Sequence, residues 1–133
     1  MAKVLIIDDD PDIVEAVRLI LESSGHTVEE ARDGASGLRK VKEFGPDLII
    51  LDVMMESDSA GFHVAYQLRS QDPESEYAAY SKVPILMLTA IGKQRGMAFS
   101  PETDQEFLPV DEFVEKPIQP ADLLEKVARL TGG

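Results

Sequence analysis

Short apolar runs alternate along the chain with segments in which apolar residues recur every three or four positions. The run at 48–51 contains only Leu and Ile, which is typical of a strand buried on both faces of a sheet. The run at 27–31 is a weaker candidate for a strand, because Glu29 and Glu30 interrupt it. Strands are predicted on this basis at 3–7, 27–31, 48–51, 84–89 and 112–115.

Helical periodicity separates these predicted strands. Ile13, Val17 and Ile20 are spaced as on one face of a helix, and similar faces recur three more times along the chain. The stretches at 72–82 and 92–110 lack this periodicity, and two prolines in the second allow only a short or broken helix. Helices are predicted from 11 to about 23, over 35–44, from about 61 to 71, and over 120–130.

The regular alternation of strand and helix predicts an α/β fold, with a parallel sheet covered by helices on both faces. Parallel neighbours need crossover connections, which the predicted helices supply. The expected strand order is 2-1-3-4-5. This order is inferred at the level of the fold, because periodicity alone does not determine it.

Composition narrows the class of protein. The 133 residues include 44% hydrophobic and 29% charged residues, which suits a single compact domain over 1–133. The absence of cysteine excludes disulfides, thiolate zinc sites and cysteine catalysis. A net charge of −12 makes the chain a poor partner for nucleic acid or an anionic membrane. No apolar run approaches the roughly 20 residues of a membrane helix or the length of a signal-peptide core, so we expect a cytoplasmic protein.

Polar side chains follow the ends of four predicted strands. Asp8 and Asp9 come after the first strand, Asp52 after the third, Thr89 closes the fourth and Lys116 follows the fifth. Ligands of open α/β sheets bind at this carboxyl edge, and in the expected order the first and third strands are neighbours. Three close carboxylates repel one another without a cation, and Mg²⁺ prefers such oxygen ligands. Mg²⁺ and the Lys116 ammonium would balance the three carboxylates until a phosphoryl group enters.

Four segments, at 4–10, 47–55, 84–90 and 111–117, carry a resemblance to a known family. They contain an acid pair, a lone acid, a hydroxyl and a Lys-Pro pair, each closing a strand. In this order the sequence resembles the receiver domain of two-component response regulators, over nearly its whole length. The resemblance implies a flavodoxin-like, doubly wound (βα)5 fold.

The resemblance also implies a role for each acid. Asp52 would be the phosphoacceptor. Asp8 and Asp9 would hold Mg²⁺, together with the Asp52 carboxylate and the backbone carbonyl of Met54.

Further roles are implied at the last two strands. Thr89 would donate a hydrogen bond to a phosphoryl oxygen, and Lys116 would pair with the same group. Phe113 would be the aromatic switch residue, and the bond between Lys116 and Pro117 is a candidate cis peptide.

These roles imply a signalling phosphoacceptor rather than an enzyme. A histidine kinase or histidine phosphotransfer protein would donate the phosphoryl group to Asp52, with Mg²⁺ and Lys116 neutralising charge. The acyl phosphate would draw Thr89 toward it, Phe113 would fill the vacated space, and a surface for an unknown downstream protein would change.

Other interpretations stay open from the residues alone. The acidic stretch at 8–12 could cap a helix, and Phe113 could be an ordinary core residue. The two histidines, His26 and His63, are expected at the surface, outside the site. The fold could serve as a protein-binding module that does not use phosphorylation. A phosphohydrolase resembling haloacid dehalogenases would need a second Asp where Met54 stands, and a flavodoxin would need Ser, Thr and Gly after the first strand.

The sequence departs from the family pattern in three places. Glu56 stands where a proline is usual after the Met pair, and the following turn is about one residue longer. The stretches at 71–82 and 92–110 contain extra residues, so we expect a remodelled fourth-helix region. Only three residues follow Leu130, so we expect a receiver without an effector domain, either stand-alone or cut from a longer chain.

Overall fold

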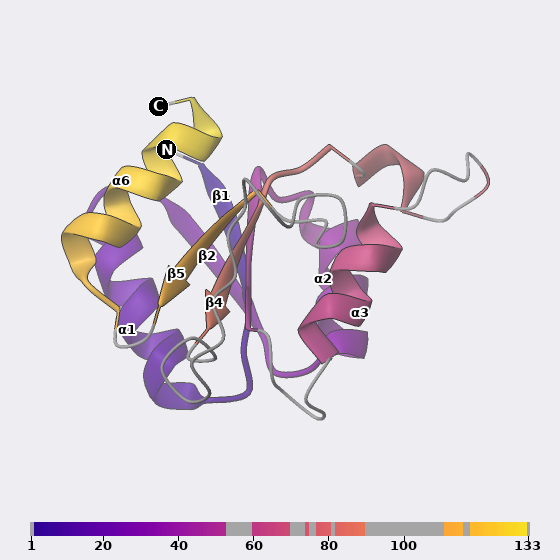
Figure 1. Ribbon diagram of the computed structural model, residues 1–133, viewed down its shortest axis with the longest axis horizontal. Coiled ribbons are helices and arrows are strands. Elements are labelled where there is room, and N and C mark those ends of the chain that lie inside the picture. The colour runs from indigo at the N-terminus through magenta and orange to yellow at the C-terminus, as the bar shows by residue number, and fades with distance from the viewer. Residues whose placement is uncertain are drawn as a thin grey trace.

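The computed structural model describes residues 2–52, 60–69, 74, 77–80, 82–89, 111–115 and 118–132. In this part of the chain, helices flank a five-stranded sheet (Figure 1). The elements in chain order are β1 (Lys3–Ile7), α1 (Pro11–Glu22), β2 (Thr27–Ala31), α2 (Gly34–Phe44), β3 (Leu48–Asp52), α3 (Ala60–Leu68), the 3-10 helix η1 (Ala78–Tyr80), β4 (Ile85–Thr89), β5 (Glu112–Glu115) and α6 (Pro120–Thr131).

All strand pairs are parallel, and the strand order is β2-β1-β3-β4-β5, which confirms the expected order and the flavodoxin-like fold. The register matters for function. Ile7 pairs with Ala31 on one side and with Leu51 on the other. The residues that follow Ile7 and Leu51 are Asp8 and Asp52, so these two aspartates lie at the same edge of the sheet, on adjacent strands.

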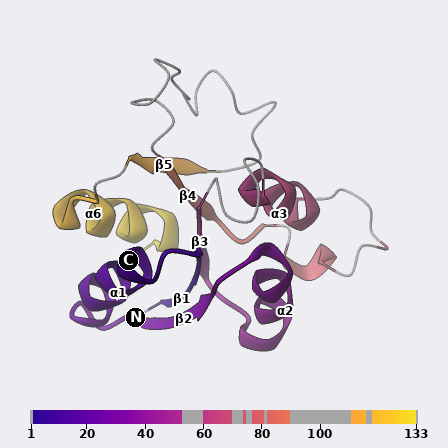
Figure 2. The ribbon, with the colours of Figure 1, turned by 90° about the horizontal axis from the view of Figure 1, so that it is seen from below.

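The helices form two layers. Figure 2 shows α1 and α6 on one face of the sheet and α2 and α3 on the other. Because side chains alternate along a strand, each central strand contributes to both apolar layers. Leu5 and Ile7 of β1 face α2 and α3, whereas Val4 and Ile6 face α1 and α6. Strands buried on both faces explain why β1 and β3 are continuous apolar runs.

Aspartates begin the first two helices. The Asp10 carboxylate accepts a hydrogen bond from the Asp12 amide (2.9 Å), and Pro11 occupies the first turn of α1. The Asp33 carboxylate accepts from the Ser36 amide (2.7 Å) at the start of α2, and this hydrogen bond lowers the pKa of Asp33.

β2 is one of the two edge strands of the described sheet, and charges surround it. Glu30 forms an ion pair with Arg18 of α1 (3.2 Å), and Glu29 forms one with Lys40 of α2 (3.5 Å). Arg18 also donates to the carbonyl of Val28 (2.9 Å). The two glutamates that weaken the strand pattern therefore connect β2 to the helices on both faces.

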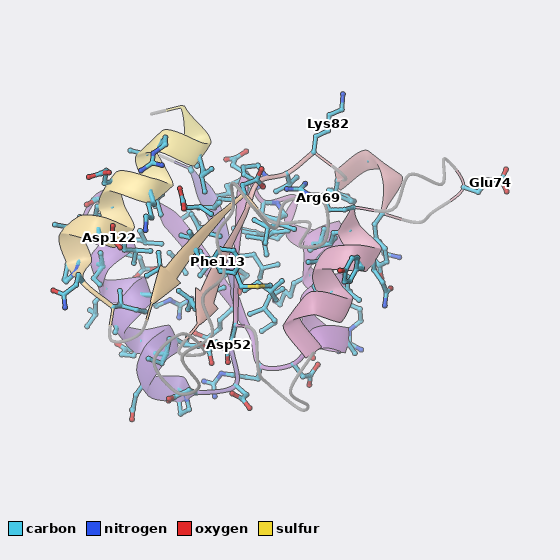
Figure 3. All side chains as sticks on the ribbon, viewed as in Figure 1. Asp52, Arg69, Glu74, Lys82, Phe113 and Asp122 are labelled. Carbon is cyan, nitrogen blue, oxygen red and sulfur yellow. The ribbon has the colours of Figure 1, made fainter. Side chains whose placement is uncertain are left out.

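A polar cluster joins α3, β4 and β5 at the amino-terminal ends of the strands, opposite the end at which Asp52 lies (Figure 3). Arg69 donates to the carbonyl of Val83 (2.7 Å) and forms an ion pair with Asp111. The same Asp111 carboxylate oxygen accepts from the amide of Ile85 (2.8 Å). These contacts connect the end of α3 to the starts of both strands.

Several elements differ from the sequence-based predictions, two of them at the end of a helix. The third helix ends at Leu68 rather than near residue 71, and the last helix continues to Thr131. The polar stretch before β4 contains the short helix η1, with Tyr77 and Tyr80 packed against the α2/α3 layer. The predicted irregular stretch at 92–110 lies outside the described residues. Within the described ranges, no helix is long and apolar enough to cross a membrane.

Candidate functional site

Three aspartates meet at the carboxyl edge of the sheet. Each of Asp8, Asp9 and Asp52 offers one carboxylate oxygen such that all three oxygens lie within 4.8 Å of one another. We call this group the aspartate cluster. Asp8 is fully buried, Asp52 is 5% exposed and Asp9 is exposed, so the cluster opens to solvent on the side of Asp9. Figure 3 shows Asp52 at the end of the molecule toward which the strand arrows point.

The backbone of the sheet fixes Asp8 and Asp52. The Asp8 amide donates to the carbonyl of Ala31 (3.0 Å), which extends the pairing of β1 with β2 by one residue. Asp52 is the last residue of β3 and pairs in register with Leu88 of β4. Oδ1 of Asp8 accepts a hydrogen bond from the Asp10 amide (2.9 Å), which orients the Asp8 carboxylate.

The chemistry of the cluster fits a hard divalent cation. Three carboxylates this close repel one another, and burial of Asp8 and Asp52 removes the water that would screen that repulsion. Two oxygens bound to one Mg²⁺ lie about 3 Å apart when adjacent and about 4 Å apart when opposite. The three carboxylate oxygens lie within 4.8 Å of one another, which is close to these values, so the cluster fits one such ion.

The other predicted site residues are described only in part. Thr89 ends β4 and pairs with Glu115, which places its backbone at the same edge, while its side chain lies outside the described part. Lys116, Pro117 and Met54 also lie outside it, so their roles and the cis peptide stay predictions.

Phe113 is buried in the apolar layer beneath α2 and α3, where its side chain is 7% exposed. It pairs in register with Met87, and its carbonyl accepts a hydrogen bond from Nζ of Lys126 in α6 (2.9 Å). A buried phenylalanine fits a core residue as well as a switch residue, so its role as a switch stays a prediction.

Helix capping and metal binding were alternative interpretations of the acidic stretch after β1. Asp10 caps α1, whereas Asp8 and Asp9 belong to the aspartate cluster, so the stretch divides between the two. His26 is half-buried rather than a simple surface group, since its Nδ1 accepts from the Ala2 amide (3.0 Å). Burial, and then the positive N-terminus, lower the pKa of His26.

The chain is similar in sequence to curated regulatory proteins. The chain is 33% identical over 130 residues to the DNA-binding dual master transcriptional regulator RpaA of Synechocystis, covering 98% of this chain and 49% of that protein. The chain thus spans about half the length of the curated relatives it matches.

Solved structures agree. The chemotaxis response regulator CheY4 of Vibrio cholerae is 34% identical with a TM-score of 0.78, over 98% of both chains. The receiver domain of the sensor histidine kinase PA1611 from Pseudomonas aeruginosa, solved with a magnesium ion coordinated in its active-site cleft, shares the fold at 23% identity, with a TM-score of 0.77 over 99% of this chain and 98% of that one. The response regulator receiver domain family matches residues 4–128. The chain therefore belongs to this family of two-component signalling domains, which are phosphoacceptors rather than true enzymes.

Proposed function

We propose that this receiver accepts a phosphoryl group on Asp52 and switches a protein-interaction surface in response. The observation that carries the proposal is the position of Asp52. Asp52 is the last residue of β3, and its side chain is buried. One of its carboxylate oxygens lies within 4.8 Å of a carboxylate oxygen of Asp8 and of Asp9. This is the edge of the sheet at which open parallel sheets bind ligands.

In this proposal the acids divide two tasks. An oxygen of Asp52 attacks phosphorus while the bond from phosphorus to the donor histidine nitrogen breaks, and the electron pair stays on that nitrogen. Asp8 and Asp9 would hold Mg²⁺ with a second oxygen of Asp52 and the carbonyl of Met54. When bound, Mg²⁺ supplies positive charge to the phosphoryl oxygens, and the magnesium seen in the related Pseudomonas domain supports this choice of ion.

Lys116 and Thr89 are proposed to complete the site. Thr89 is the last residue of β4, one position beyond the residue that pairs with Asp52. Lys116 directly follows Glu115, which pairs with Thr89. These backbone positions support a hydroxyl and an ammonium at the same edge as Asp52, where they would bind the phosphoryl oxygens.

The proposed switch connects this edge to the sheet interior. Movement of Thr89 toward the phosphoryl group would change the packing around β4, and Phe113 of the neighbouring strand would respond. Because Phe113 lies beside Met87 in the α2/α3 layer, a new rotamer would alter the surface over β4 and β5.

The partners follow from this chemistry. We propose a sensor histidine kinase or a histidine phosphotransfer protein as donor, a downstream protein as target, and residues 1–133 as one cytoplasmic receiver unit. The charge of −12 argues against direct contact of this unit with nucleic acid, although several longer relatives bind DNA.

The test is phosphorylation by acetyl phosphate. With Mg²⁺, intact-mass spectrometry should show one added phosphoryl group, and peptide mapping should locate it on Asp52. Asp52→Asn and chelation of Mg²⁺ should abolish the addition. Asp47→Asn is the matched control, since Asp47 is an exposed aspartate just before the same strand and should leave labelling unchanged. Labelling that survives Asp52→Asn would contradict the proposal, and no labelling at all would favour a binding module.

A further inference from the structure

The turn between β1 and α1 contains two linked hydrogen bonds that the proposed mechanism does not use. The first runs from the Asp10 amide to Oδ1 of Asp8 (2.9 Å). The second runs from the Asp12 amide to Oδ1 of Asp10 (2.9 Å). Asp10 therefore takes part in both bonds, once through its amide and once through its carboxylate.

The second bond constrains the geometry of the first. By accepting from Asp12, the Asp10 side chain holds its own backbone in an extended conformation (φ −92°, ψ 110°) at the start of the helix. In that conformation the Asp10 amide points to the Asp8 carboxylate. The Asp10 carbonyl also accepts the first helical hydrogen bond, from Val14 (3.1 Å), so the turn is held on the helix side as well.

We propose that Asp10 is a positioning residue for the divalent cation of the aspartate cluster. Its side chain keeps the turn in shape, and the turn keeps Oδ1 of Asp8 occupied and the Asp8 carboxylate in one orientation. This inference rests on the proposed function, because it assigns Mg²⁺ to the cluster. It adds a residue outside the proposed ligand set that determines how tightly the ion binds.

Charge offers a competing explanation, since Asp10 is a further acid beside the cluster. Two variants that both lack the Asp10 charge, one with and one without a capping oxygen, distinguish the two explanations. Asp10→Asn removes the charge but keeps an oxygen that caps a helix as well as Asp does, whereas Asp10→Ala removes both. Asp12→Asn removes one charge from the same turn and leaves the amide that donates to Asp10.

The experiment is a calorimetric Mg²⁺ titration without phosphodonor, at pH 7, on the wild-type chain and the variants. We expect Asp10→Ala to bind Mg²⁺ about fivefold more weakly than Asp10→Asn, the factor that corresponds to loss of a helix cap. Asp10→Asn and Asp12→Asn should resemble each other. In acetyl phosphate labelling, the Mg²⁺ concentration for half-maximal rate should rise in Asp10→Ala, while the rate at saturating Mg²⁺ stays unchanged.

Asp33→Ala controls for loss of stability, because Asp33 caps α2 in the same way without a bond to Asp8. We expect it to keep the wild-type Mg²⁺ affinity. If Asp10→Ala does not fold, Asp10→Gly gives the same comparison, since Gly is tolerated at a helix cap but offers no acceptor.

Equal Mg²⁺ affinity of Asp10→Ala and Asp10→Asn would overturn the inference, and so would an equal weakening in Asp33→Ala. Failure of the proposed function has a different signature, namely absence of labelling on Asp52 in the wild-type chain at saturating Mg²⁺.

Discussion

Replacing Gly37 by Ala tests how closely α2 packs on β1. A Cβ atom at this position would lie 2.5 Å from Cδ1 of Ile7, 2.9 Å from its Cγ1 and 3.0 Å from its Cγ2. Ile7 is fully buried, and branching at its Cβ restricts its rotamers, so the side chain has little room to turn away. We therefore expect α2 to move outward or Ile7 to adopt a strained rotamer.

Two opposing effects determine the magnitude. Ala favours a helix over Gly by about 1 kcal/mol. Overpacking a filled core costs about 1–3 kcal/mol, and a contact as short as 2.5 Å belongs in the upper part of that range. The net expectation is a loss of about 1–2 kcal/mol in the free energy of unfolding.

Urea denaturation of a double-mutant cycle measures the clash directly. Ile7→Val removes Cδ1, the atom nearest to the added methyl group, so the double variant should recover part of the loss. We expect a coupling energy of about 1 kcal/mol between Gly37→Ala and Ile7→Val. Two results would refute the reasoning. One is a Gly37→Ala variant that is more stable than the wild type, as helix propensity alone predicts. The other is a double variant whose loss of stability equals the sum of the two single losses.

Three more predictions concern polar groups. Asp111→Asn should lower the free energy of unfolding by about 0.5–1 kcal/mol, because it removes the charge that pairs with half-buried Arg69 while Asp111 itself is exposed; an unchanged urea midpoint would count against that. The lowered pKa of His26 means that the folded state disfavours the protonated ring. The contribution of His26 to the free energy of unfolding should therefore be full above about pH 6.5, and it should decline as the pH falls through that value toward the lower pKa of the folded state. In a curve of stability against pH measured by urea denaturation, His26→Asn should flatten this region. Asp52→Asn should raise the melting temperature in chelator, since it relieves repulsion within the aspartate cluster, and should reduce the rise that Mg²⁺ produces; a lower melting temperature in chelator would contradict this.

The strands and the acids at their ends could be predicted from the sequence because both signals are local. β1 and β3 are buried on both faces, so their apolar residues form unbroken runs, and Asp8 and Asp52 directly follow these runs. The parallel register converts that sequence position into spatial proximity. The strand order itself came from knowledge of the fold class, and the structure confirms it.

Other features depend on contacts between distant residues, which a sequence pattern does not encode. The close approach of Gly37 to Ile7 joins residues 30 positions apart, and the pairing of Arg69 with Asp111 spans 42 positions. The end of α3 was placed too late because polar residues after Leu68 are compatible with a helix surface. His26 accepts a hydrogen bond from an amide 24 positions away, so its partial burial could not be predicted.

The charged border of β2 has a consequence for how copies of the protein meet. An edge strand offers unpaired backbone groups that another strand can join, and proteins block this with charged side chains. Glu29 and Glu30 stand on opposite faces of that edge, each held by a helix cation. A second β2 strand approaching in this plane would bring like charges together in a desolvated interface. The residues that obscure the strand in the sequence thus oppose growth of the sheet into an aggregate.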